Sequence, residues 1–151
     1  MDTLDDLKKT DPVHNSGEWA IDTANKDYFS RDAGRAHRTT DTVQSLAWSG
    51  GECTNFAASI YFDVKLDINS LVTFVSSING KDWQPVKTAR SPSVSSGGGW
   101  NVSTFRPETS SLPAGSRFMK LQLAPSGTNW NVQVGRMELY RKGSALGNKV
   151  R

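Results

Sequence analysis

Two tryptophans of this sequence lie among residues that could bind a sugar ring. Trp100 directly follows three glycines, and Trp130 lies in a run of amide side chains. The amides that flank or follow the two tryptophans are Asn101, Asn129, Asn131 and Gln133. A sugar presents an apolar face of C–H groups and a rim of hydroxyls, so its binding site needs a flat aromatic surface beside hydrogen-bonding groups. We therefore expect Trp100, Trp130, Asn101, Asn129 and Asn131 to bind a ligand; the alternative is that both indoles pack in the protein interior.

Three carboxylates could hold a hard cation such as calcium. Asp27 and Asp32 belong to a polar segment, residues 27–35, whose carboxylates and carbonyls could wrap around an ion. Glu138 would complete this structural calcium site if the end of the chain meets that segment. The alternative is that arginines, and not a metal, neutralise Asp32 and Glu138. The candidate arginines are Arg35, Arg38 and Arg136.

Signals for catalysis are weak. The sequence has two histidines, no nucleophile elbow, no zinc-binding histidine pair and no glycine-rich loop between a strand and a helix. The acidic residues have no sequence neighbours that would raise their pKa values. Cys53 is the only cysteine, so it cannot form an intrachain disulfide and is expected to be a buried or incidental thiol. We expect no enzyme activity.

Net charge and hydropathy limit the classes of partner that this protein is expected to bind. The net charge of +3 is small for 151 residues, and the basic residues are interspersed with acidic ones. Binding to a nucleic-acid backbone would need a basic stripe, and crossing a bilayer would need a longer apolar run. We expect a monomer with neither nucleic-acid nor membrane partners. The first ten residues are too acidic and polar for a signal peptide, so we expect either a cytosolic protein or a segment excised from a larger protein.

Strands must position these side chains, because alternating apolar and polar residues continue through most of the chain after residue 35. In residues 56–64, for example, Phe56, Ala58, Ile60 and Phe62 fall on one face. The expected strands cover residues 43–48, 56–64, 71–78, 83–90, 100–106, 117–123 and 134–140. The predicted fold class is all-β, an antiparallel β-sandwich of about seven to nine strands in two sheets. A single domain is expected over residues 1–141, and residues 142–151 are expected to be a linker.

Turns and loops complete this prediction. Helical turns are expected only over residues 2–9 and 22–27, and a tight hairpin turn is expected at Asn79-Gly80. If successive strands are antiparallel, the loops at 64–69, 91–99 and 125–132 lie at one end of the sandwich. The loops at 49–54, 79–82 and 107–115 then lie at the other end. Further polar residues near the first end could hydrogen-bond sugar hydroxyls. These candidate ligand-binding residues are Arg90, Lys65, Asp67 and Asn69; a solvated surface position is the alternative for each.

Motifs along nearly the whole chain carry a family resemblance. They are Ser16-Gly17-Glu18-Trp19 with Asp22-Thr23; Tyr28-Phe29-x-x-Asp32-x-x-Arg35-x-x-Arg38-Thr39; Ser77-x-Asn79-Gly80-x-x-Trp83; Leu112-Pro113-Ala114-Gly115-x-x-Phe118-x-Lys120-Leu121; and Trp130-Asn131-x-Gln133-x-Gly135-Arg136-x-Glu138-Leu139. In order and spacing they resemble carbohydrate-binding modules of the galactose-binding-domain-like β-sandwich type. Such modules are appended to secreted bacterial polysaccharide-degrading enzymes.

The resemblance implies a jelly-roll sandwich, a structural calcium near the first long loop and the last strand, a sugar site in end loops, and secretion. The expected function is non-catalytic binding of a polysaccharide that holds the catalytic domain of a parent enzyme on its substrate. Several arginines would suit an acidic polysaccharide. The alternative is a structural or protein-interaction sandwich that packs against a neighbouring catalytic domain.

Overall fold

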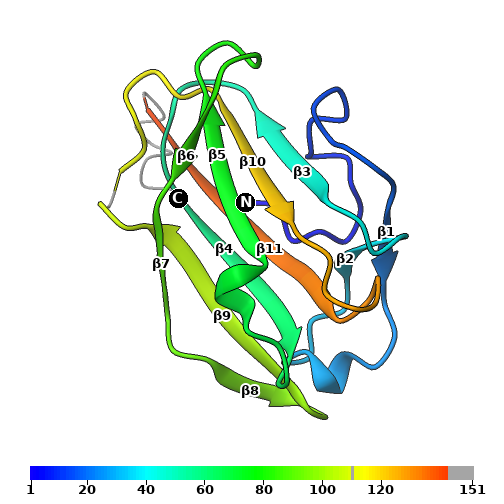
Figure 1. Ribbon diagram of the computed structural model, residues 1–151. Helices are drawn as coiled ribbons and strands as arrows, with labels where there is room; N and C mark the ends of the chain where they lie inside the picture. Colours follow the sequence, from blue (N-terminus) through cyan, green and yellow to red (C-terminus); the bar gives the residue numbers. More distant parts are fainter. Residues whose placement is uncertain (110, 143–151) are drawn as a thin grey trace.

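Two antiparallel β-sheets pack face to face in the computed structural model, which describes residues 1–109 and 111–142 (Figure 1). The seven-stranded sheet has the order β1 (Trp19–Asp22), β2 (Arg35–Arg38), β11 (Val132–Arg141), β4 (Cys53–Asp63), β9 (Trp100–Pro107) and β7 (Thr88–Arg90), and β8 (Val94–Gly97) also pairs with β9. The four-stranded sheet has the order β3 (Gln44–Ser49), β10 (Phe118–Leu123), β5 (Val72–Ser77) and β6 (Trp83–Val86). The predicted all-β antiparallel sandwich is confirmed.

The described residues form eleven strands, more than the predicted seven to nine. Part of the difference is that the strand predicted over residues 83–90 is two strands, β6 and β7, which belong to different sheets. The chain crosses between the sheets at Lys87, and alternation in sequence does not reveal such a crossing. The short strands β1, β2 and β8 supply the remainder.

Local structure departs from the sequence prediction at three places. Residues 2–9 form no helix, because the backbone N–H and C=O of Asp2 pair instead with Met137. A short 3-10 helix, η1 (Lys26–Tyr28), overlaps the turn expected at 22–27, and η2 (Ile68–Ser70) was not expected. The loop between β5 and β6 spans residues 78–82, in which Asn79 Oδ1 accepts from two backbone N–H groups and only Gly80 has a positive φ, of 77°.

The core lies between the sheets and follows the predicted alternation. Phe56, Ala58, Ile60 and Phe62 of β4 are all buried, and the Phe56 ring packs 4.8 Å from that of Phe74 in the other sheet. Burying each large apolar side chain contributes about 1.5–3 kcal/mol. Cys53 is also buried, as predicted.

A second, smaller cluster lies on the outer face of the seven-stranded sheet. Phe29 packs against Trp100 at 4.6 Å and against Tyr61 at 5.4 Å between ring centroids, with Val102 beside them. Because Tyr61 follows the core residue Ile60 in β4, its side chain points away from the core. The segment 25–34 therefore folds over this face and buries its own small apolar cluster there.

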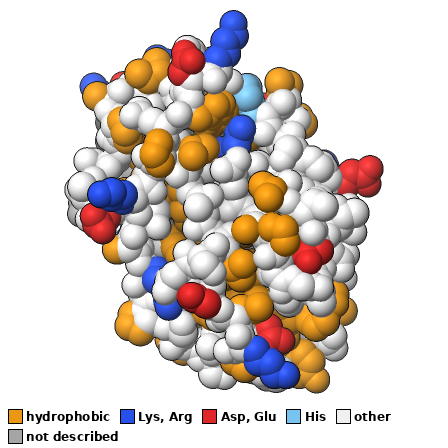
Figure 2. Space-filling model, viewed as in Figure 1, with side chains coloured by type: hydrophobic (Ala, Val, Ile, Leu, Met, Phe, Trp, Pro, Cys, Tyr) orange, Lys and Arg blue, Asp and Glu red, His pale blue; other side chains and the backbone are white. Residues whose placement is uncertain are grey.

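The predicted grouping of end loops is confirmed by backbone hydrogen bonds. At one end, the lower end of Figure 1, Val64 N–H donates to Gly99 C=O and Asp63 N–H donates to Asn131 C=O. At the other end, Cys53 N–H donates to Ser116 C=O. The side chains over the four-stranded sheet include scattered charges of both signs (Figure 2). The described residues contain no helix that is long and apolar enough to cross a membrane.

Candidate functional site

Arg35 fixes the segment that forms one side of the candidate site. Its side chain is fully buried, and Nε donates to Gln133 Oε1 at 3.0 Å. Nη1 donates to the carbonyl of Asp32 and Nη2 to that of Ala24, each at 2.6 Å. The guanidinium carbon lies 3.7 Å from the centre of the Phe29 ring. Arg35 thus ties residues 24–32 to β11.

Arg38 does the same for the loop between β10 and β11. Its fully buried guanidinium donates to the carbonyl of Ala124 at 2.9 Å and to Ser126 Oγ at 2.9 Å. Asp41 supports the same loop, because its carboxylate accepts from the N–H groups of Ser126 and Gly127. Two buried arginines therefore hold the two loops that meet at the end of the sandwich.

Between these loops lies a depression of about 300 Å³, which we call the end depression. Its described lining residues are Asp22, Asn25, Tyr28, Phe29, Trp100, Trp130 and Gln133. Trp130 is 48% exposed and Tyr28 is 44% exposed, whereas Trp100 is only 8% exposed. The centroids of the Trp100 and Trp130 rings lie 6.0 Å apart at an interplanar angle of 50°. The depression thus has two accessible aromatic rings above a buried aromatic base.

Polar groups accompany the rings. Asp22 Oδ2 accepts from Gln133 Nε2 at 3.1 Å, and Oδ1 accepts from the Ala24 N–H at 2.9 Å. Burial opposes ionisation of Asp22, but these hydrogen bonds and the charge of Arg35 together hold its pKa below the usual value. The side-chain amide of Asn25, the hydroxyl of Tyr28 and the indole N–H of Trp130 make no hydrogen bond to the residues that the structure describes. The depression therefore has donors and acceptors available to a ligand.

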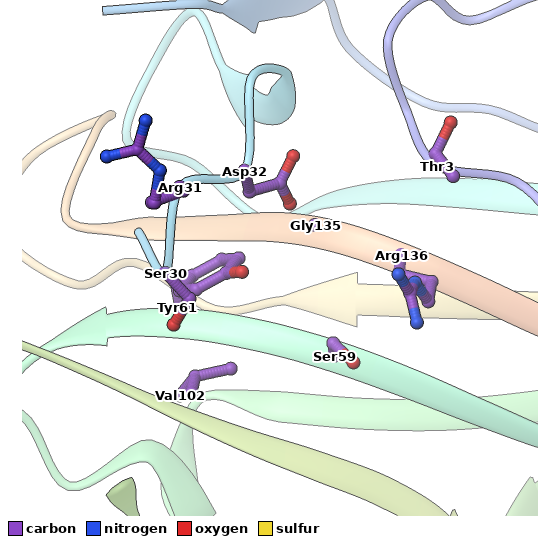
Figure 3. A pocket seen from close by; sticks show the side chains of 9 residues that line it. All are labelled: Thr3, Ser30, Arg31, Asp32, Ser59, Tyr61, Val102, Gly135 and Arg136. Carbon is purple, nitrogen blue, oxygen red and sulfur yellow. The ribbon is translucent and has the colours of Figure 1, made fainter. Parts of the chain in front are cut away.

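A second hollow, of about 380 Å³, lies on the outer face of the seven-stranded sheet, and we call it the sheet-face hollow (Figure 3). Its described lining residues are Thr3, Ser30, Arg31, Asp32, Ser59, Tyr61, Val102, Gly135 and Arg136. Gly135 lies at a β-bulge of β11, where an added Cβ would overlap the ring of Tyr61. The absence of a side chain there lets Tyr61 and Asp32 lie close over the strand.

The polar groups of the sheet-face hollow are mostly engaged or buried. Tyr61 is only 6% exposed, and burial, together with the charge of Asp32, raises its pKa to about 12. Burial also raises the pKa of Asp32. Arg31 pairs with Asp27 at 2.9 Å, and Arg136 lies 3.7 Å from Glu138. The hollow thus lacks an accessible aromatic ring among its described residues.

The structure brings together some of the predicted ligand-binding residues. Trp100 and Trp130 both line the end depression, but Trp100 is too buried to offer an open stacking face. The segment 25–34 covers it, which its position after three glycines did not indicate.

The predicted asparagines lie outside the end depression. Asn131 is buried and exchanges hydrogen bonds with the backbone and side chain of Ser126, and Asn129 Nδ2 donates to Thr39 C=O at 3.2 Å. Asn101 is half-buried within β9. The amides of Asn129 and Asn131 thus satisfy polar groups of the loops at this end, because groups buried there need partners.

The charged candidates also lie elsewhere. Arg90 pairs with Phe105 in the middle of β9, and it donates to Asn69 Oδ1 at 2.7 Å and to Ser103 Oγ at 3.0 Å. Asp67 caps η2 by accepting from the Asn69 N–H. Arg90, Asn69 and Asp67 therefore tie η2 to the sheet edge. Lys65 is exposed, and like the other three it does not line the end depression.

The three predicted metal ligands are not gathered at one point. Asp27 faces Arg31, Asp32 lines the sheet-face hollow, and Glu138 accepts from the Tyr140 hydroxyl. Within residues 1–109 and 111–142 there is no group of three acidic, histidine or cysteine side chains that could hold a metal. An ion pair with an arginine, the alternative predicted for Asp32 and Glu138, is present at Glu138, where Arg136 lies 3.7 Å away. Asp27 pairs with Arg31, which was not predicted. Calcium stays a prediction.

Sequence reasoning missed Asp22, Asn25 and Tyr28 as lining residues, and it missed the burial of Arg35 and Arg38. Tyr28 stands beside Phe29 in the sequence, yet one ring is exposed and the other buried. No local pattern separates them. The only signal was that Gln133 follows Trp130 by three residues, which places both near the start of β11.

The fold and the end depression define an all-β sandwich with an aromatic-lined site at one end. Comparison with known proteins adds no identification, since no family model matches the chain and no curated protein or solved structure matches it significantly. The function is therefore argued from the geometry of the site.

Proposed function

We propose that this sandwich binds a polysaccharide without catalysis, by stacking a sugar ring on Trp130 in the end depression. The observation that carries the proposal is the pairing of exposed aromatic rings, Trp130 and Tyr28, with polar groups that have no partner among the described residues. An indole offers a flat apolar surface to the C–H face of a sugar. The carboxylate of Asp22 and the free groups of Asn25 and Tyr28 suit its hydroxyls.

The rigidity of the site supports binding. Trp130 packs against the buried Trp100, and its carbonyl accepts from Gln133 Nε2 at 3.0 Å. The backbone N–H of Trp130 donates to Thr128 Oγ1 within the same loop. A ring held in this way loses little conformational freedom when a sugar stacks on it. A shallow site with one or two stacked rings typically gives a Kd from micromolar to millimolar.

A non-catalytic role suits the carboxylates. Glycoside hydrolysis normally uses two carboxyl groups on either side of the scissile bond. Among the described residues that line the end depression, Asp22 is the only carboxylate, and its lowered pKa does not suit a general acid. We propose that the module holds an attached catalytic domain on its substrate outside the cell, as the family resemblance implies. The same proposal includes a structural calcium ion. Comparing the thermal unfolding temperature in CaCl2 with that in EDTA tests this part.

Affinity electrophoresis through gels that contain a panel of neutral and acidic polysaccharides tests the proposal. The wild type should be retarded by at least one polymer, and Trp130→Ala should migrate freely because the stacking surface is gone. Trp83→Ala is the matched control, since Trp83 lies at the start of β6 beneath Lys120, in the other sheet. It should be retarded like the wild type. If no polymer retards the wild type, the protein-interaction alternative replaces this proposal.

A further inference from the structure

Resting on the proposed function, we propose that the end depression selects sugars by charge: it binds neutral hexopyranose units and rejects uronates, and Asp22 determines this selectivity.

Asp22 presents a negative charge at the site. It lies at the end of β1, its side chain is 26% exposed, and it lines the depression beside Trp130 and Gln133. Each carboxylate oxygen accepts one hydrogen bond, from the Ala24 N–H or from Gln133, which leaves lone pairs for sugar hydroxyls. Its pKa, below the usual range, keeps it ionised at neutral pH. A sugar carboxylate placed beside it would meet a like charge.

The described lining of the depression offers no cation that a ligand carboxylate could contact. Arg35 Nη2 lies 3.5 Å from Asp22 Oδ1, but the Arg35 side chain is fully buried and cannot contact a ligand. The described lining residues include no lysine and no arginine. Lys26 is exposed in η1 next to Asn25, but it does not line the depression.

The aromatic rings favour the same selectivity. Trp130 and Tyr28 present π faces that carry partial negative charge, so they attract cations and not carboxylates. Arginines suggested an acidic ligand from the sequence, yet in the fold they are committed elsewhere. Arg38 is buried, Arg31 pairs with Asp27, and Arg90 is held by Asn69 and Ser103.

The test compares three forms of one polymer. The neutral polysaccharide that retards the wild type most is oxidised at C6, which converts its primary alcohols to carboxylates, and part of the product is then methyl-esterified. At low ionic strength the oxidised form should bind at least about tenfold more weakly, and the ester should recover most of the affinity. In about 1 M NaCl the difference between neutral and oxidised forms should shrink, because salt screens exposed charges.

Variants assign the selectivity to Asp22. Asp22→Asn should narrow the difference between the neutral and oxidised forms, and Lys26→Ala should not narrow it. Asp22→Asn also disturbs the contacts with Gln133 and Arg35, so the salt and ester comparisons on the wild type stand independently of how that variant folds. Equal or tighter binding of the oxidised form at low salt, or retardation by natural uronate polymers alone, would overturn the charge selectivity while leaving polysaccharide binding intact. If no polymer, neutral or acidic, retards the wild type, both the charge selectivity and polysaccharide binding are overturned.

Discussion

The end depression and the sheet-face hollow are both lined by one segment, residues 25–34. Asn25, Tyr28 and Phe29 line the first, and Ser30, Arg31 and Asp32 line the second. The sheet-face hollow has the larger volume, about 380 Å³ against about 300 Å³. Its one aromatic ring among the described residues is buried, however, whereas the end depression exposes two. Accessible rings and unengaged polar groups, more than volume, therefore distinguish a candidate sugar site.

Backbone geometry explains how residues 25–34 can line both the end depression and the sheet-face hollow. Ser30 and Arg31 have φ values of 53° and 65°, in the left-handed region that side chains other than glycine seldom adopt. Their N–H groups donate to the carbonyls of Ser96 and Lys26, which hold the segment in this conformation. This left-handed conformation reverses the chain between Phe29 and Asp32, and it costs on the order of 1–3 kcal/mol per residue. The same segment thus faces two depressions.

The largest expected effect comes from the residue that supports both regions. Arg35→Ala should lower the free energy of unfolding by about 3–5 kcal/mol, because it leaves Asp22 and two carbonyls without their buried partner. Arg31→Ala, which removes an exposed arginine from the same segment, should change it by less than about 1 kcal/mol. Urea denaturation followed by fluorescence measures both. Equal effects would mean that Arg35 does not organise the segment.

The next effect separates the two regions by ligand binding. Tyr28→Ala should weaken polysaccharide binding by about tenfold, through loss of about 1.4 kcal/mol of ring contact. Arg136→Ala, in the sheet-face hollow, should leave the affinity within about twofold. Titration calorimetry with a soluble oligosaccharide measures the two values. The opposite ranking would move the sugar site to the sheet-face hollow.

A substitution at the bulge tests the hollow by itself. Gly135→Ala should destabilise the fold by about 1–3 kcal/mol, because the new Cβ would overlap the ring of Tyr61 and approach Asp32 Oδ2 to 2.8 Å. Gly51→Ala is a suitable control, since nothing lies within 4 Å of a Cβ at that position. Thermal unfolding measures the difference. Polysaccharide binding below the unfolding temperature should remain in both variants if the end depression is the site.

The smallest effect is a difference in response to acid. Burial raises the pKa of Asp32, so on acidification the folded protein takes up this proton before the unfolded chain does. The free energy of unfolding should therefore gain a contribution from Asp32 as pH falls toward the ordinary aspartate pKa of 3.8. The pKa of Asp22 is lowered despite burial, so its contribution is complete above 3.8 and is lost as pH falls through its folded pKa. Asp32→Asn should remove the gain in stability on acidification, and Asp22→Asn should remove the loss. Urea unfolding between pH 7 and pH 3 measures the free energy of unfolding as a function of pH. The prediction is contradicted if both variants change this pH dependence in the same direction.

The sequence by itself determined the all-β class, the inward residues of β4 and the end at which each loop lies. Side-chain alternation and turn residues are local signals, and antiparallel pairing converts them into positions at one end or the other. Trp130 was found in this way, because it stands in a loop just before β11.

Only the tertiary structure decided which loop residues a ligand can reach. Trp100 lies beneath residues 25–34, Tyr28 is exposed where Phe29 is buried, and Arg35 and Arg38 are enclosed despite their charges. Whether each of these side chains is buried depends on which distant segment folds over it and on which backbone carbonyls lie within hydrogen-bonding distance of it. Outside the regular alternation of the core strands, burial is a property of the packed chain, and the types and spacing of neighbouring residues do not encode it.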